Sequence, residues 1–237
     1  MKNLRRFGPF AERPYFEPAE IEEICREALA SVSLYPAEPS PVRIDRFIEK
    51  RFGIAPVYEE LPKGVLGYTE FGPKGVQRIV ISRALDDEGS QTAERRIATT
   101  LAHEGGHGLL HAHLFALGAR GASLFGDEVD SLRPKIMCRQ EGSPQQAPVR
   151  GKRYDGRWWE FQANQAIGGL LLPRSLVERS LLSLTEETGS FGRRILQAAR
   201  RDDAVRVLAE VFNVNPVVAG IRLDELYPTA GAAQLTL

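Results

Sequence analysis

The amino-acid sequence predicts an α+β fold, with a small antiparallel sheet packed on a mainly helical body. Three short extended runs, at 54–60, 64–71 and 76–82, are separated by the turn sequences Pro-Lys-Gly and Gly-Pro-Lys-Gly, a pattern typical of consecutive antiparallel strands. On either side of these runs, apolar side chains recur at helical spacing. The chain of 237 residues is long enough to bury a sizeable core, and we expect one domain over 1–237.

Helices are expected before and after the sheet, and several have a local start or stop signal. The segments 18–34 and 42–52 have amphipathic spacing, and Gly53 follows the second as a stop signal. The segment 91–113 follows Ser90, a residue suited to cap its first turn. The same periodicity predicts further helices at 157–172, 174–183, 190–200, 203–212 and 216–226.

The expected domain has three consecutive parts. Residues 18–90 hold two helices and the small sheet, and 173–227 hold the C-terminal helices. The middle part, 91–172, holds the two helices that carry the candidate metal ligands. A long insertion at 114–156 separates these two helices. It is rich in glycine and polar residues, and we expect loops there with one strand at Lys135–Arg139.

The composition excludes several classes of protein. Hydrophobic residues make up 43% and charged residues 26% of the chain, which is typical of a folded globular protein and not of a disordered one. The 31 Lys and Arg balance the 31 Asp and Glu, so net charge favours neither nucleic acid nor an anionic membrane as a partner. Two cysteines cannot build a disulfide framework, and we find neither a run of ~20 apolar residues nor a secretory signal. We therefore expect a cytoplasmic protein without a membrane partner.

All four histidines lie within eleven residues, and two of them form the motif His103-Glu104-Gly-Gly-His107. Residues four apart lie on one face of a helix, so both imidazoles can bind one Zn²⁺ ion, with Mn²⁺ as the other candidate. Glu104 lies about 100° further round the helix, where it can accept a proton from a water that the metal activates. The motif predicts a hydrolytic metal centre, with His103 and His107 as ligands and Glu104 as general base. The alternative is an ordinary pair of helix histidines.

Three glycines interrupt this predicted helix, at positions 105, 106 and 108. Each costs ~1 kcal/mol relative to alanine in a helix interior, and such a local inconsistency tends to mark close packing or function. We expect Gly105, Gly106 and Gly108 to let another element pack tightly against the metal-binding turn. The alternative is that the helix frays after His107.

The two other histidines follow on the same helix. His111 lies eight residues after His103, ~12 Å along the helix axis, so it can at most hydrogen-bond a ligand or line the cleft. His113 has the spacing of the HExxHxxGxxH motif, but Leu110 stands where that motif has the glycine that breaks the helix. His113 stays open as a rival third ligand.

Glu160 is the preferred third ligand. It lies in the segment Trp158–Asn164 of the next metal-site helix, and its aromatic neighbours argue against full exposure. A carboxylate from a second helix completes a His₂Glu site and leaves one coordination position for water. Asn164, one turn later, is expected to hydrogen-bond a ligating imidazole, and Gly168 to let the two helices approach closely. Tyr154, just before the helix, is the candidate for stabilising an oxyanion.

The two metal-site segments resemble the ImmA/IrrE family of cytoplasmic zinc metallopeptidases. The family usually reads HELGH where this chain has HEGGH, and a pattern close to ExEANxFAxxLLMP where it has EFQANQAIGGLLLP. The resemblance extends over about 18–226, including the strand VQRIVIS and the closing segment LAEVFNVNPVVAGIRLDEL. It implies a zincin-like fold and cleavage of a helix-turn-helix repressor. It also implies that His103, His107 and Glu160 bind zinc and that Glu104 is the base.

The chain departs from the family pattern in three places. Gly105 replaces a leucine, Gln162 replaces a glutamate, and the 53-residue step from His107 to Glu160 is longer. We expect the two substitutions to leave the metal chemistry unchanged. The longer insertion is expected to frame the cleft and to bear on substrate recognition.

Two other functions stay open. In the first, the zinc site is intact but the protein acts by binding, as a regulator or a toxin–antitoxin component with little proteolysis. In the second, residues 203–226 form a DNA-binding helix-turn-helix, and the metal motif is a remnant. The segment 216–226 carries Arg222 against Asp224 and Glu225, which favours a packing pair of helices and disfavours direct DNA binding. The expected partner is a protein substrate, and the sequence carries no signal for an oligomeric state.

Overall fold

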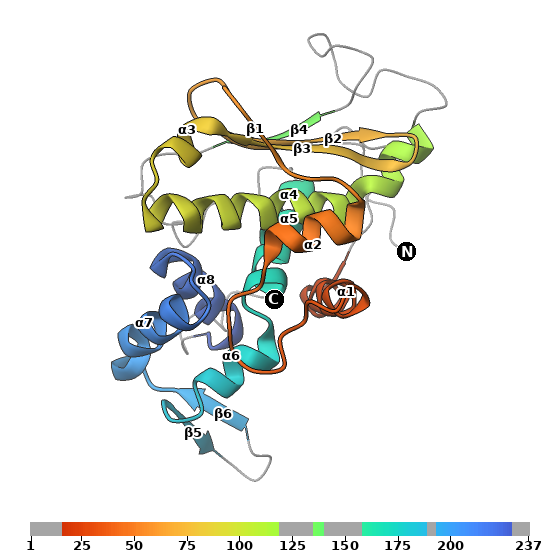
Figure 1. The fold of residues 1–237 in the computed structure, drawn as a ribbon. Helices are drawn as coiled ribbons and strands as arrows, with labels where there is room; N and C mark the ends of the chain where they lie inside the picture. Colours follow the sequence, from red (N-terminus) through yellow and green to blue (C-terminus); the bar gives the residue numbers. More distant parts are fainter. Residues whose placement is uncertain (1–15, 119–134, 140–157, 189–192, 229–237) are drawn as a thin grey trace.

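The computed structural model describes residues 16–118, 135–139, 158–188 and 193–228, and it has the expected α+β architecture (Figure 1). In chain order the elements are α1 (Pro18–Ser31), α2 (Ile44–Phe52), β1 (Val57–Glu59), β2 (Val65–Gly72), β3 (Gly75–Ser82), α3 (Arg83–Asp87), α4 (Gln91–Gly118), β4 (Lys135–Arg139), α5 (Trp158–Leu171), α6 (Arg174–Ser180), β5 (Thr185–Thr188), β6 (Arg193–Leu196), the 3₁₀ helix η1 (Ala198–Arg200), α7 (Arg201–Val211) and α8 (Pro216–Leu226).

Strands β1 to β4 form one sheet in the order β1-β3-β2-β4. β2 and β3 are an antiparallel hairpin, and β4 extends the sheet antiparallel to β2, which confirms the strand predicted at Lys135–Arg139. β1, however, pairs in parallel with β3, with Val57 opposite Val80. The prediction of a purely antiparallel sheet is therefore wrong, and the sheet is mixed.

The parallel pair results from the place that β1 takes in the sheet. The chain reverses direction between β1 and β2 and again between β2 and β3, so β1 and β3 run the same way. β1 lies beside β3, while β4 occupies the other side of β2. Turn residues signal each reversal of direction, but they do not determine beside which strand the chain returns.

Helix α4 lies at the centre of the fold. It runs along one face of the four-stranded sheet, where it contacts β2 and β3, while α5 packs against another side of it (Figure 1). α2 packs beside α4, α1 packs against α5, and α7 and α8 lie further from the sheet (Figure 1). One hydrophobic core extends from Ile79 in the sheet through Leu101 and Leu110 of α4 to Leu223 of α8.

Local signals mark the ends of several helices, as the sequence predicts. Gly53 ends α2 in the left-handed conformation, with φ 71°, which glycine adopts without steric cost. Ser90 Oγ accepts a hydrogen bond from the backbone N–H of Ala93, at 3.1 Å, and caps the start of α4. The short helix α3 is an element that the sequence pattern did not predict.

The predicted helix at 190–200 is wrong, because the described part of this segment contains strand β6, which pairs with β5. The predicted helix at 174–183 is also shorter, and α6 ends at Ser180. Arg194 donates hydrogen bonds to Thr185 Oγ1 and to the carbonyl oxygens of Thr185 and Leu182, each at 2.8 Å. These contacts across the hairpin favour an extended backbone over the helix preference of the segment.

The three glycines of α4 lie at close contacts, and the helix does not fray after His107 but continues to Gly118. A Cβ atom would meet Ile48 Cδ1 at 3.0 Å from residue 105, Ala166 Cβ at 2.8 Å from residue 106 and Phe52 Cζ at 2.7 Å from residue 108. Close packing against the turn that carries His103 and His107 is therefore confirmed, with α2 on one side and α5 on another.

Gly168 has a different role from the one predicted. A Cβ atom there would lie 3.1 Å from Arg222 Cδ and 3.2 Å from Glu225 Oε2, both on α8. The missing side chain therefore lets α8 approach α5, and it does not serve the contact between α4 and α5.

The last two helices pack onto the rest of the fold. Arg222 of α8 is buried, donates to the carbonyl oxygen of Leu172 at 3.0 Å and forms ion pairs with Glu22 of α1 and with Glu225. These contacts hold α8 against the rest of the fold, as expected if α7 and α8 are a packing pair of helices. Among the described residues, no single helix is long and apolar enough to cross a membrane; the segment 198–211 and α8 meet that test only as a pair, bent by 119°.

Replacing Gly106 by alanine is expected to lower the free energy of unfolding by ~1–3 kcal/mol, the usual cost of overpacking a core. The added Cβ would overlap with Ala166 Cβ and come within 3.2 Å of the carbonyl oxygen of Ala163. Gly220 in α8 is the matched control, because a Cβ there meets only Val205, at 4.0 Å. The helix preference of alanine should stabilise this control by up to ~1 kcal/mol. Urea denaturation compares the two variants, and equal stabilisation of both would contradict close packing at Gly106.

Candidate metal centre

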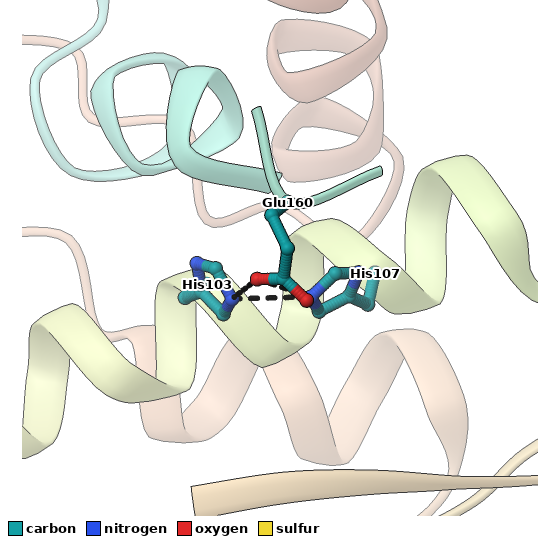
Figure 2. A group of neighbouring side chains, drawn as sticks. All are labelled: His103, His107 and Glu160. Atoms are coloured by element: carbon teal, nitrogen blue, oxygen red, sulfur yellow. Dashed lines mark hydrogen bonds and ion pairs between the residues drawn. The ribbon is translucent and has the colours of Figure 1, made fainter. Parts of the chain in front are cut away.

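Two imidazoles of α4 and one carboxylate of α5 meet where these helices are in contact. His103 and His107 lie one turn apart on α4, with their Nε2 atoms 3.1 Å from each other. Glu160, in the first turn of α5, places Oε2 3.3 Å from His103 Nε2 and 3.8 Å from His107 Nε2 (Figure 2). One ligand atom of each residue lies within 4.8 Å of the others. These three side chains could hold a metal ion.

The packing of the helices explains why Glu160 reaches the two rings. Gly106 lies between His103 and His107 in the chain, and a Cβ atom there would lie 3.2 Å from the carbonyl oxygen of Ala163 on α5. Because no side chain at position 106 separates α4 from α5, the side chain of Glu160 can reach both imidazoles. His103 is 4% exposed and His107 is 0% exposed, which keeps water from competing for the donor atoms.

Hydrogen bonding outside the cluster orients the ring of His103. Its Nδ1 lies 3.0 Å from Asn164 Oδ1, an amide oxygen that can only accept, so the ring donates its proton there. When this ring is neutral, His103 Nε2 carries a lone pair and faces His107 Nε2 and the carboxylate of Glu160. Such a group of electron-pair donors, with one negative charge, is stabilised by a cation.

The pKa values of Glu160 and His103 show the same preference for positive charge. Burial opposes the ionisation of Glu160, but the close contacts with His103 and His107 hold its pKa well below the usual range. Burial also opposes the protonation of His103, yet the hydrogen bond to Glu160 and the charge of Glu104 raise its pKa. Burial lowers the pKa of His107 to about 4, so this ring is neutral at pH 7, as a metal ligand must be.

Glu104 is fully buried, and its two carboxylate oxygens have different surroundings. Thr69 of β2 donates a hydrogen bond from Oγ1 to Oε2, at 2.6 Å. Oε1 is buried and has no hydrogen-bond partner among the residues that the structure describes. Burial raises the pKa of Glu104 to about 7. Thr69 of the sheet therefore holds Oε2 of Glu104. Oε1 can interact with a group that the described residues do not supply.

The remaining predicted site residues have different outcomes. His111 Nδ1 lies 3.0 Å from His107 Nδ1, so His111 contacts one ring of the three-donor group, as Asn164 contacts the other. His113 is exposed and does not join the cluster, because α4 continues unbroken through the buried Leu110. The rival arrangement with His113 as third ligand is therefore not formed. Tyr154 lies outside the described residues, and its role stays a prediction.

Two residues of the site were missed by the sequence analysis. Thr69 is 35 positions from Glu104 in the chain, and Gln162, whose Oε1 is 3.0 Å from His111 Nε2, is 51 positions from that histidine. Nothing in the strand pattern distinguishes Thr69 from its neighbours. For Gln162 the available signal was its place in the second metal-site segment, between Glu160 and Asn164.

Comparison of the chain with protein-family models, with curated proteins and with solved structures gave no match in any of the three.

Titration with Zn²⁺ is expected to show one bound ion per chain for the wild-type protein and loss of that ion for His107→Asn. The substitution removes Nε2, one of the three converging donor atoms. His113→Asn on the same helix is the matched control, because this histidine is exposed and outside the cluster. Competition with a chromophoric chelator gives the affinities, and circular dichroism checks the fold. Tight one-to-one binding by His107→Asn, or equal loss in both variants, would refute the centre.

Proposed function

We propose that this protein is a zinc-dependent endopeptidase. One observation carries the proposal. Beside the three-donor group of His103, His107 and Glu160 lies a buried glutamate, Glu104, with one oxygen that no residue in the described part of the chain hydrogen-bonds. Two imidazoles and a carboxylate are a usual ligand set of catalytic zinc sites, which keep one position open. A carboxyl group beside such a site, but outside the ligand set, can serve as general base for the hydrolysis of a peptide bond.

Zinc fits this donor set better than manganese, because imidazole suits Zn²⁺ and Mn²⁺ prefers oxygen ligands. When bound by His103, His107 and Glu160, zinc would supply a Lewis acid that polarises the scissile carbonyl and lowers the pKa of the attacking water. Asn164 accepts a hydrogen bond from the far side of the His103 ring and so turns Nε2 toward Glu160. The hydrogen bonds of the protein itself thus orient the donors.

Glu104 transfers the proton. Oε1 takes a proton from the attacking water and later gives it to the leaving amine, and a pKa of about 7 suits both transfers. Thr69 holds Oε2 at 2.6 Å, which keeps the carboxylate from rotating away. Thr69 is therefore a positioning residue for the base.

The substrate class rests on the resemblance of the two metal-site segments to the ImmA/IrrE family. By that resemblance the substrate is a helix-turn-helix transcriptional repressor, and the place of cleavage is the cytoplasm. A proteolytic role agrees with the surface of α8, since its only basic residue, Arg222, is buried in ion pairs with Glu22 and Glu225. A helix that reads DNA needs exposed basic or polar side chains.

Glu104→Gln is expected to abolish proteolysis while the protein keeps one zinc ion per chain. The amide cannot take a proton at Oε1, and the three ligands are unchanged. The zinc-loaded protein is incubated with a proteome-derived peptide library, and new termini are identified by mass spectrometry. Glu94→Gln, at an exposed position of the same helix, is the matched control and should cleave at the wild-type rate.

The outcomes separate the endopeptidase from a protein that acts by binding. Zinc-loaded wild type that produces no new termini, or a Glu104→Gln variant that cleaves at the wild-type rate, would overturn the proposal. A Glu104→Gln variant that still relieves repression of a target promoter would favour the binding protein instead.

Thr69→Val is expected to lower kcat by about tenfold or more, the scale on which misplacing a general base acts, with KM and zinc content unchanged. Valine has the shape of threonine but lacks the hydroxyl that donates to Glu104. Thr69→Ser keeps the hydroxyl and should restore most of the rate. Thr185→Val, a buried threonine on β5, controls for the loss of a buried hydroxyl elsewhere. Equal rates for Thr69→Val and Thr69→Ser would show that the hydroxyl has no positioning role.

A further inference from the structure

A chain of hydrogen bonds connects a metal ligand of α4 to Gln162 on α5. His107 Nδ1 lies 3.0 Å from His111 Nδ1, and His111 Nε2 lies 3.0 Å from Gln162 Oε1. His107 and His111 are 0% exposed and Gln162 is 4% exposed. The three groups therefore interact within the core, where a mismatched donor or acceptor is costly.

The chemistry of the rings gives this chain a direction. A neutral histidine that binds a metal through Nε2 carries its proton on Nδ1, so His107 Nδ1 donates to His111 Nδ1. His111 then accepts at Nδ1 and carries its own proton on Nε2. That proton is donated to Gln162 Oε1, an amide oxygen that can only accept. Both hydrogen bonds thus run from His107 through His111 to Gln162.

The other ligand is held in the same manner. His103 donates directly to Asn164 Oδ1, also on α5. Each ligating ring is therefore connected to an amide oxygen of α5, His103 in one step and His107 in two. Trp158, one helical turn before Gln162, packs edge-on against His111, with ring centroids 5.5 Å apart and planes at 79°. This contact restrains the plane of the intermediate ring.

We propose that Gln162, acting through His111, holds His107 in the tautomer that presents an unprotonated Nε2 to the metal. Without an acceptor at Oε1, the proton of His111 can move to Nδ1 and face His107 Nδ1. His107 must then accept at Nδ1 and carry its proton on Nε2, where the metal would bind. Gln162 and His111 are thus positioning residues of the metal centre. The inference rests on the metal centre of the proposed function, and it adds the control of ligand tautomer.

Gln162→Met tests the relay through zinc affinity. Methionine is similar in length but has no oxygen acceptor, and removing the partner of a metal-binding histidine typically costs 10–100-fold in affinity. We expect a loss of this size, with one ion per chain retained. Gln165→Met on the same helix is the matched control, because Gln165 donates to Glu225 of α8, at 3.0 Å, and does not touch the histidines. Its zinc affinity should equal that of the wild type.

Nitrogen-15 NMR of labelled histidines provides a readout that does not depend on activity. The chain has four histidines, so the ring signals can be assigned one by one. In zinc-loaded wild type and in Gln165→Met, His111 should carry its proton on Nε2 and His107 on Nδ1. Gln162→Met should show a second tautomer of His111.

Gln162→Glu separates the relay from packing, since it keeps an oxygen acceptor at the same place. It should bind zinc at least as tightly as the wild type and show the wild-type tautomers. Wild-type affinity and tautomers in Gln162→Met, or equal loss in the Met and Glu variants, would overturn the relay. A wild-type protein that binds zinc and shows the expected tautomers but cleaves no peptide would instead overturn the endopeptidase and leave the relay in place.

Discussion

The close contact between α4 and α5 is the constraint on which the candidate site depends. At Gly106 the helices pack without an intervening side chain, since an added Cβ would lie 2.8 Å from Ala166 Cβ. At this separation the short side chain of Glu160 reaches two imidazoles of the neighbouring helix. Glycine in a helix interior costs ~1 kcal/mol relative to alanine. The glycine therefore lowers the stability of the helix itself, but it lets α5 approach closely enough for Glu160 to meet His103 and His107.

Helix α4 places its functional side chains between two layers that act on them differently. On the sheet side, Thr69 of β2 holds one oxygen of Glu104. On the α5 side, Glu160 faces His103 and His107, and the amide oxygen of Asn164 accepts a hydrogen bond from His103. The amide oxygen of Gln162 is hydrogen-bonded to His111, which contacts His107. Neighbouring residues of one helix point about 100° apart, so a proposed base and a proposed ligand, adjacent in sequence, are positioned by different layers.

For the fold, the sequence predicted features that depend on nearby residues. Gly53 and Ser90 mark helix ends through contacts made within one turn, so their signals could be read directly. The direction of β1 and the strand β6 could not be predicted in this way. β1 is parallel because it lies beside β3, and β6 is extended because Arg194 finds its acceptors across the hairpin. Both outcomes depend on partners that local propensity does not describe.

The sequence by itself determined that His103, Glu104 and His107 share one helix, because helix geometry alone sets the positions of residues one and four apart. It also pointed to Glu160, since its segment has the residue types that complete a metal site. Only the tertiary structure decided that Thr69 and Gln162 belong to the same centre. A hydroxyl or an amide acquires a role from the atom that it contacts, and these atoms are brought together by the packing of α4 between the sheet and α5.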